Sequence, residues 1–260
     1  MNFIPPIFIS HGSPMLMLEP GRAGPAWQAL ARSLPRPRAI LAVSAHWTAM
    51  APAVSAAAPP QTIHDFYGFP EALYDLDYPA PGTPELAAQV AALLPGIHVD
   101  ARRGLDHGAW SPLRAMYPMA DIPVIQFAVM PRESAAAHYQ LGRKLRALAQ
   151  DGVLVLASGG LTHNLGDVVW DAADGIALPH VREFRDAFVD ALQRRDLPAL
   201  FDWQGRMPHA RRAHPTAEHL LPLFVALGAA GDDAQAATAF SDFQLGALAL
   251  DSFVFDSATA

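Results

Sequence analysis

Short apolar segments alternate with amphipathic ones along the chain, and three of the apolar segments run into a turn that contains a histidine. The three apolar runs of strand length occupy residues 3–9, 39–43 and 153–157. Small polar residues and one histidine follow each run: His11, His46 and His163. Such runs, followed by Gly, Ser or Pro, are typical of buried strands that end in a turn. Because site residues of α/β sheets gather at the carboxyl ends of the strands, we expect these histidines to converge.

The intervals between the apolar runs have helical character. The pattern predicts helices at residues 26–34, 84–94, 134–150, 180–195 and 218–227, and further strands at residues 97–99, 123–129 and within 240–255. Thr83 and Thr216 are candidate N-caps, and Pro84 suits a first helical turn. Strands that alternate with helices predict one α/β domain over residues 1–260, with a central, mostly parallel or mixed sheet flanked by helices. The histidines would then lie at the edge of that sheet.

Composition narrows the class of protein. No stretch reaches the ~18 uncharged apolar residues of a membrane span, and no basic region followed by an apolar run marks a signal peptide. The absence of cysteine excludes disulfides and thiolate metal sites. A net charge of −7 without a long basic cluster argues against a nucleic-acid partner. We therefore expect a cytoplasmic protein, monomeric or homodimeric, that acts on a small molecule.

Histidine is the residue type that carries the chemistry here. Six of the 11 histidines lie in segments rich in Gly, Ser, Pro or Thr: His11, His46, His107, His163, His214 and His219. A lone histidine after a strand is usually structural, but three such histidines without any cysteine favour a metal site. Nitrogen and oxygen ligands suit Fe(II), Zn, Mn or Co. The His-Glu-x-x-His and Gly-x-Ser-x-Gly patterns are absent, so neither a helical zinc peptidase nor that type of serine hydrolase is indicated.

Seven short motifs follow one another along most of the chain. They include a Ser-His-Gly-Ser-Pro turn, an Asp-Phe-Tyr-Gly-Phe-Pro segment and a Glu-His pair. The seven occupy residues 8–14, 44–47, 65–70, 78–82, 105–110, 158–165 and 215–219. In this order they resemble the DOPA-dioxygenase branch of the class III extradiol ring-cleaving dioxygenases.

That resemblance implies an α/β fold with a non-haem metal at the edge of its sheet and an activity that opens catechol-type rings with O₂. It assigns His11 and His46 to the metal. The third ligand falls at His219 or at the adjacent Glu218, of which His219 matches the family position. His163 is a possible fourth ligand when zinc occupies the site, whereas Fe(II) is the metal expected for activity.

The resemblance also implies catalytic and substrate-binding residues. His163 matches the acid–base histidine of the family and His107 a second active-site histidine. A histidine of this kind can accept a proton from a catechol hydroxyl and later return it. Four aromatic side chains beside the histidine turns are candidates for contact with a flat ring: Phe66, Tyr67, Trp47 and Trp110.

Three functions stay open at this point. The first is an Fe(II) extradiol dioxygenase acting on a DOPA-like or other substituted catechol. The second is a zinc hydrolase that uses the same histidines to activate water. The third is a non-catalytic metal-binding relative on the same fold. The basic stretch at residues 206–212 could attract a carboxylated substrate.

Overall fold

Eight strands form the central sheet within residues 3–257, the part of the chain that the computed structural model describes. Their order is β4-β3-β5-β2-β6-β1-β10-β7. The strands are β1 (Ile7–Ser10), β2 (Ala39–Thr48), β3 (Ala53–Ser55), β4 (His98–Asp100), β5 (Val124–Val129), β6 (Val153–Gly159), β7 (Ala234–Phe240) and β10 (Ser252–Ser257). A separate two-stranded hairpin joins β8 (Phe243–Gln244) to β9 (Leu248–Ala249).

The middle of the sheet is parallel and its edges are mixed. β5, β2, β6 and β1 run in the same direction, and β10 then pairs antiparallel with β1. Side chains alternate between two apolar layers: in β1, Ile7 and Ile9 enter one layer and Phe8 the other. A sheet buried on both faces explains why these strands are continuously apolar in sequence. The predicted fold class, an α/β domain with a central mixed sheet, is confirmed.

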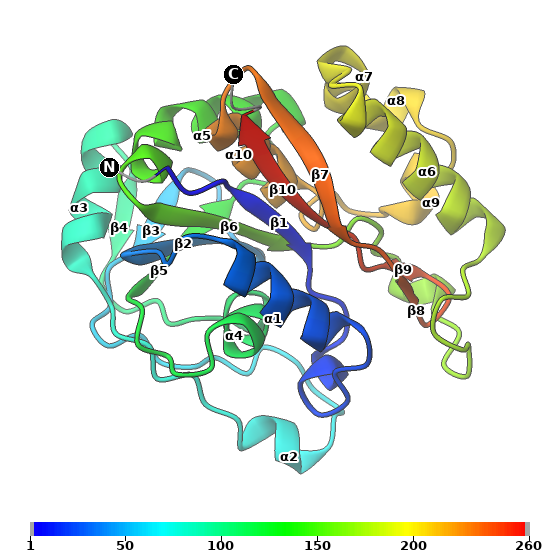
Figure 1. Cartoon of the computed structure of the whole chain (residues 1–260), viewed down its shortest axis with the longest axis horizontal. Coiled ribbons are helices and arrows are strands. Elements are labelled where there is room, and N and C mark those ends of the chain that lie inside the picture. The colour runs from blue at the N-terminus through cyan, green and yellow to red at the C-terminus, as the bar shows by residue number, and fades with distance from the viewer. Residues whose placement is uncertain (1–2, 258–260) are drawn as a thin grey trace.

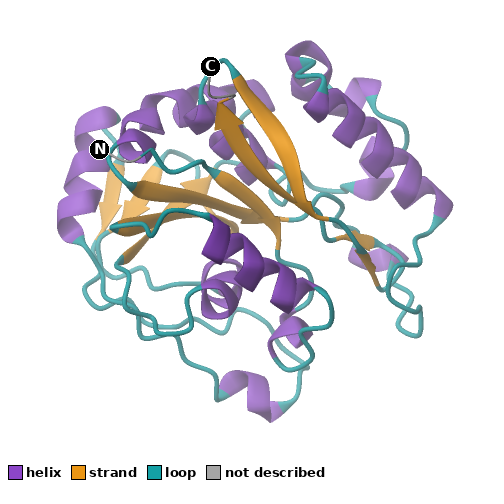
Figure 2. Ribbon diagram, in the orientation of Figure 1, coloured by secondary structure: helices purple, strands orange, loops and turns teal. Residues whose placement is uncertain are grey.

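Helices cover both faces of the sheet (Figures 1 and 2). α1 and α4 pack on one face with the layer that contains Ile7, and α3, α5 and α10 contribute to the other layer. The helices are α1 (Ala23–Ser33), α2 (Glu71–Tyr74), α3 (Pro84–Leu93), α4 (His107–Met116), α5 (Ala135–Gln150), α6 (Pro179–Gln193), α7 (Leu197–Phe201), α8 (Trp203–Arg206), α9 (Ala210–Ala213) and α10 (Leu221–Ala230), with 3₁₀ turns η1 (Pro14–Met17) and η2 (Leu165–Asp167). No helix in the described part of the chain is long and apolar enough to cross a membrane.

Two boundaries near the histidines differ from the sequence prediction. The helix expected from residue 218 begins only at Leu221, and Thr216 does not cap it, because the Thr216 hydroxyl donates to Glu218 Oε1 (2.9 Å). The sequence placed His107 in a segment rich in Gly and Ser and predicted no helix there. The structure places it in the first turn of α4, because the Asp106 carboxylate accepts from the Ala109 amide (3.2 Å) as an N-cap. His107 therefore has a fixed helical position.

Candidate metal centre

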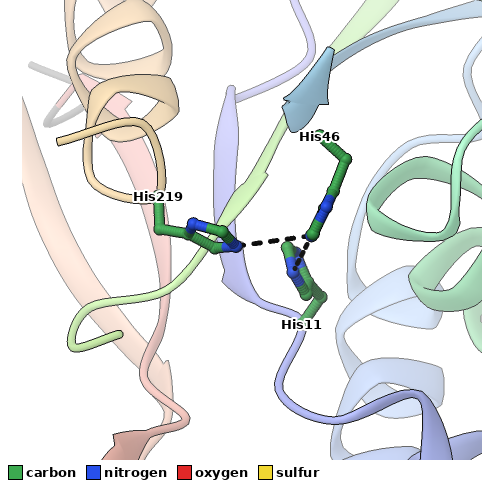
Figure 3. Close-up of side chains that lie close together, drawn as sticks. All are labelled: His11, His46 and His219. Carbon is green, nitrogen blue, oxygen red and sulfur yellow. Dashed lines mark hydrogen bonds between the residues drawn. The ribbon is translucent and has the colours of Figure 1, made fainter. Parts of the chain in front are cut away.

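Three histidine rings point at one another at the carboxyl ends of the parallel strands (Figure 3). His11 directly follows β1, His46 lies near the end of β2, and His219 lies just before α10. The Nε2 atoms of His11 and His46 are 3.0 Å apart, and those of His46 and His219 are 3.3 Å apart. His11 and His219 are buried, and His46 is partly buried.

This spacing fits a metal ion. Imidazole nitrogens bind such metals at about 2.1 Å, so two ligand nitrogens would be about 3.0 Å apart at a right angle and about 3.4 Å apart at the tetrahedral angle. The observed separations of 3.0 and 3.3 Å lie within that range. The three nitrogens are therefore placed as one face of a coordination shell.

The other ring nitrogen of each histidine meets an oxygen atom that can accept its proton. The three pairs are His11 Nδ1 with Ser158 Oγ (2.9 Å), His46 Nδ1 with Asp65 Oδ2 (3.4 Å) and His219 Nδ1 with Glu218 Oε1 (3.1 Å). A proton on Nδ1 leaves the Nε2 lone pair free to face the shared point. Outer partners of this kind orient metal-binding histidines and fix their tautomer.

Burial favours the neutral form of all three rings. Burial, with a smaller contribution from neighbouring imidazoles, lowers the pKa of His11 and of His219 well below the ordinary histidine range. Burial and the nearby His107 lower the pKa of His46 to about 3. Neutral imidazole is the form that binds a metal. Three lone pairs directed at one point repel one another until a cation lies between them.

Glu218 and His163 are arranged around His219. The Glu218 carboxylate accepts from the outer nitrogen of His219, on the opposite side of the ring from His46. The His163 ring lies flat against the His219 ring, with centroids 3.4 Å apart and planes within 5°. His163 forms a close cluster with Glu218 and His219, whereas His11, His46 and His219 form another. Burial lowers the pKa of His163, against the opposing charge of Glu218.

Asp65 connects the aromatic segment to two histidines. Its Oδ1 accepts from both the amide and Nδ1 of His107 (2.9 Å each), while Oδ2 faces His46. Burial alone would raise the pKa of Asp65, but its hydrogen bonds and charge interaction with His107 outweigh burial and lower this pKa to about 2. The ring centroids of His46 and His107 are 3.9 Å apart. The sequence motif contained Asp65, but nothing in the sequence indicated its partners.

A second carboxylate, fully buried, fixes α4 beneath this cluster. Both oxygens of Asp106 have partners: Oδ1 accepts from Ser44 (2.6 Å), and Oδ2 from Gln126 (2.7 Å) and Arg103 (2.6 Å). A buried charge is tolerated when it is paired and hydrogen-bonded in this way. Asp106 thus holds the start of α4 against β2 and β5, and with it His107. The sequence predicted no role for Asp106.

Two glycines allow the backbone to approach the histidines. A Cβ on Gly108 would lie 2.5 Å from Ser44 Oγ and 2.9 Å from His46 Cδ2. A Cβ on Gly159 would lie 2.0 Å from the carbonyl oxygen of His219, which also accepts from the Gly160 amide (2.9 Å). The end of β6 therefore determines where His219 lies.

Replacing Gly159 by alanine should consequently displace His219. We expect the Gly159→Ala variant to lose about 1–3 kcal/mol of unfolding free energy from overpacking and to bind metal about 10–100-fold more weakly, as when the orientation of a ligand is lost. Urea unfolding and metal titration measure the two effects. Gly166→Ala is the control, because the nearest atom to its Cβ would be the Asn164 side-chain oxygen at 3.2 Å. Unchanged metal affinity in Gly159→Ala would contradict this account.

His214 holds the turn that carries His163. Its Nε2 lies 2.9 Å from the Leu161 carbonyl oxygen, and the His163 amide donates to the Ala213 carbonyl (2.9 Å). The His214 ring is buried, and burial lowers its pKa to about 4. The sequence placed His214 among the histidines able to reach a site, and the structure places it behind the site instead.

The lowered pKa of His214 predicts acid sensitivity. The unfolded chain takes up a proton below about pH 6.5, but folded His214 resists protonation until about pH 4, so stability falls as the pH decreases through this window. Between pH 7 and pH 5 the metal-free wild type should lose about 2 kcal/mol more than His214→Gln, whose amide can still donate to Leu161. Urea unfolding with a chelator measures this difference. An equal loss in both proteins would show that His214 does not contribute.

A cavity of about 580 Å³ opens above the histidines. His11, His46, His107 and His163 line its inner part, and Phe66 and Tyr67 line it farther out. Trp47 and Trp110, also expected to contact the substrate, are not among its lining residues. Their contact with the substrate stays a prediction, and in the structure other side chains cover both rings. The Trp110 ring is fully buried behind Phe66, with centroids 6.3 Å apart, and the Trp47 ring is covered by the Arg103 guanidinium at 5.2 Å.

Comparison with known proteins shows the family to which the chain belongs. Residues 5–245 match the family described as the catalytic LigB subunit of aromatic ring-opening dioxygenase. The 4,5-DOPA dioxygenase extradiol of Escherichia coli is 42% identical over 236 residues, covering 87% of this chain and 85% of that protein. The protein of the same name from Beta vulgaris is 38% identical over 259 residues, covering 96% of each. A crystal structure of an uncharacterized E. coli K12 protein matches with a TM-score of 0.81 at 34% identity, covering 96% of this chain and 98% of that one.

The family match and these relatives show an enzyme of the aromatic ring-opening dioxygenase class, and the cluster of His11, His46 and His219 is its candidate metal site. The chain belongs to the LigB family of aromatic ring-opening dioxygenases.

Proposed function

We propose that this protein is an Fe(II)-dependent extradiol dioxygenase that opens the ring of a catechol with O₂. The observation that carries the proposal is the convergence of three neutral imidazole Nε2 atoms, 3.0 and 3.3 Å apart, beside a cavity with aromatic walls. Relatives named 4,5-DOPA dioxygenase extradiol support a catechol-type ring, with DOPA or another substituted catechol as the substrate.

His11, His46 and His219 would hold the metal. Glu218 faces the outer nitrogen of His219, so we assign it the orientation of that ring rather than a place in the coordination shell. Three protein ligands leave positions open for the two catechol oxygens and for O₂. Bound Fe(II) supplies the redox capacity that reaction with O₂ requires and that zinc lacks.

The roles that we propose for His163 and His107 are to move protons and to position the catechol ring. Both line the cavity. His163 stacks on His219 but belongs to a different close cluster from His11 and His46. We therefore do not count it among the three metal ligands and assign it proton transfer with a catechol hydroxyl. Its role as a fourth ligand when zinc occupies the site stays a prediction, which a crystal structure of the zinc-loaded protein would test. His107 donates to Asp65 through Nδ1, which leaves its Nε2 free to accept a hydrogen bond.

Metal reconstitution tests the proposal. The protein is stripped of metal, loaded without oxygen with Fe(II) or with Zn(II), and mixed with catechol, 4-methylcatechol and DOPA. We expect O₂ consumption in a 1:1 ratio to catechol, and a yellow ring-opened product, only with Fe(II). Hydrolytic activity with Zn(II), without O₂ uptake after iron loading, would indicate a zinc hydrolase. Tight metal binding without turnover of any catechol would indicate a non-catalytic relative.

A further inference from the structure

The outer part of the cavity is apolar and contains no cationic side chain. None of its 19 lining residues is Lys or Arg. Its outer wall combines two segments far apart in the sequence, the aromatic loop before α2 and the segment from η2 to α6. Figure 1 shows where α2 and α6 lie in the fold. The side chains of these walls are Phe66, Tyr67, Phe69, Leu165, Val168 and Trp170.

Arg212, which contacts η2 in this wall, is already engaged. Arg212 donates to both oxygens of Asp167 (2.9 and 3.1 Å), and Asp167 belongs to η2, between Leu165 and Val168. Arg206, at the start of the same basic stretch, is 3.4 Å from Asp202. The expectation that residues 206–212 attract a carboxylated substrate therefore has no support in the cavity wall.

No free carboxylate is available for a cationic substituent either. Asp65 is the one acidic residue in the lining, and both its oxygens face histidines, Oδ1 toward His107 and Oδ2 toward His46. An amine or a carboxylate on the ring substituent would thus find no ionic partner in this lining, and whatever water it lost on binding would cost free energy. An alkyl or aryl substituent would gain from burial against the same wall.

The volume of the cavity and the exposure of its outer side chains also favour an apolar substituent. A cavity of about 580 Å³ falls within the range that encloses drug-sized ligands, so there is room beyond a single ring. Trp170 and Leu165 are 78% and 65% exposed, which is unusual for large apolar side chains that also line a cavity. The segment that carries them is held at its ends, where the Val169 amide donates to Leu245 (2.9 Å) and the Leu178 amide to Gly246 (2.9 Å).

We propose that the substrate is a catechol whose ring substituent is uncharged and apolar, and that Leu165 and Trp170 contact this substituent. The proposal rests on the catechol dioxygenase activity proposed above and specifies its substrate class. Each methylene buried against the wall should raise kcat/KM about fourfold, and less where it stays partly in water.

The test compares substituted catechols of similar size, with bare catechol as the reference, on the Fe(II)-loaded enzyme. The substrates are bare catechol, 4-propylcatechol, 3-(3,4-dihydroxyphenyl)propionate, DOPA and 3,4-dihydroxyphenethylamine. We expect kcat/KM for 4-propylcatechol to exceed that for the propionate, DOPA and the amine by about tenfold or more. A carboxylated or amine substrate that equals or exceeds 4-propylcatechol would overturn the proposal. Because bare catechol reports the ring chemistry alone, its turnover separates a wrong substituent class from a wrong function; turnover of no catechol would overturn both.

Variants at the wall test the residues named. Leu165→Arg should raise kcat/KM for the propionate relative to 4-propylcatechol by about tenfold, since it supplies the missing cation, whereas Leu165→Gln, without the charge, should not. Trp170→Ala should reduce the preference for 4-propylcatechol over bare catechol by about threefold or more. Met119→Ala is the control, because Met119 is equally exposed, at 79%, but lies outside the cavity lining. Unchanged preferences in Leu165→Arg and Trp170→Ala would overturn the assignment of these residues.

Discussion

Alanine in place of His11, His46 or His219 should abolish ring opening and most of the metal binding. We expect each single variant to lose at least about a thousandfold in kcat/KM and at least about 100-fold in metal affinity, since a lost ligand costs no less than a lost outer partner. Metal analysis, metal titration and O₂ uptake measure these effects. His98→Ala, which removes an exposed histidine in β4, should change none of them.

The stability of the metal-free variants separates ligand loss from misfolding. The Nε2 atoms lie 3.0 and 3.3 Å apart. With the proton of each ring on Nδ1, their lone pairs repel one another when no cation is bound. Removing one ring should therefore leave the Tm of the chelated protein unchanged or higher. Glu218→Ala should weaken metal binding only about 10–100-fold, because Glu218 orients His219. A Glu218 variant that loses as much metal as His219→Ala would assign the third ligand to the carboxylate instead.

Alanine in place of His163 should leave the metal bound and remove proton transfer. We expect kcat to fall by about 10²–10⁴, the usual contribution of a positioned acid–base group, with metal content as in the wild type. Single-turnover kinetics under O₂, together with metal analysis, test this expectation. His163→Gln, which preserves hydrogen bonding but not basicity, should be equally slow. Loss of metal together with the ring would identify His163 as a ligand, and unchanged kcat would exclude it from the chemistry.

The strands and the histidines at their ends were predictable from the sequence for a physical reason. A parallel strand buried on both faces must be apolar along its length, so residues 39–43 and 153–157 were visible as runs. The polar residues that interrupt such runs lie at the carboxyl edge of the sheet. His11 and His46 could therefore be placed together before the structure was known.

The supporting contacts could not be predicted, because they join distant parts of the chain. Ser158 faces His11 across 147 positions, and Asp65 reaches His107 across 42. Nothing local in the sequence distinguishes these polar residues from others on loops. Asp106 likewise resembled an ordinary turn residue, although it is fully buried among Ser44, Gln126 and Arg103.

The residues that line the cavity could not be predicted from the sequence either. Trp110 is an aromatic residue beside a predicted active-site histidine, so the sequence suggested contact with a flat substrate. Its position in the first turn of α4 directs the indole into the core, where Nε1 donates to the Ile63 carbonyl (2.9 Å). Trp170 lies in a segment for which the sequence predicted neither an element nor a role, and Leu165 is the last residue of the motif at residues 158–165. Only the tertiary fold brings that segment to the cavity, through its contacts with the turn between β8 and β9.

A crystal structure of the iron-loaded protein with a catechol, obtained without oxygen and with anomalous data at the iron edge, tests the central claim most directly. We predict one iron bound by Nε2 of His11, His46 and His219 at about 2.1 Å, with both catechol oxygens on the same ion and His163 beside the ring. Iron held instead by the neighbouring cluster of His163 and Glu218, or by that of Asp65 and His107, would contradict the account.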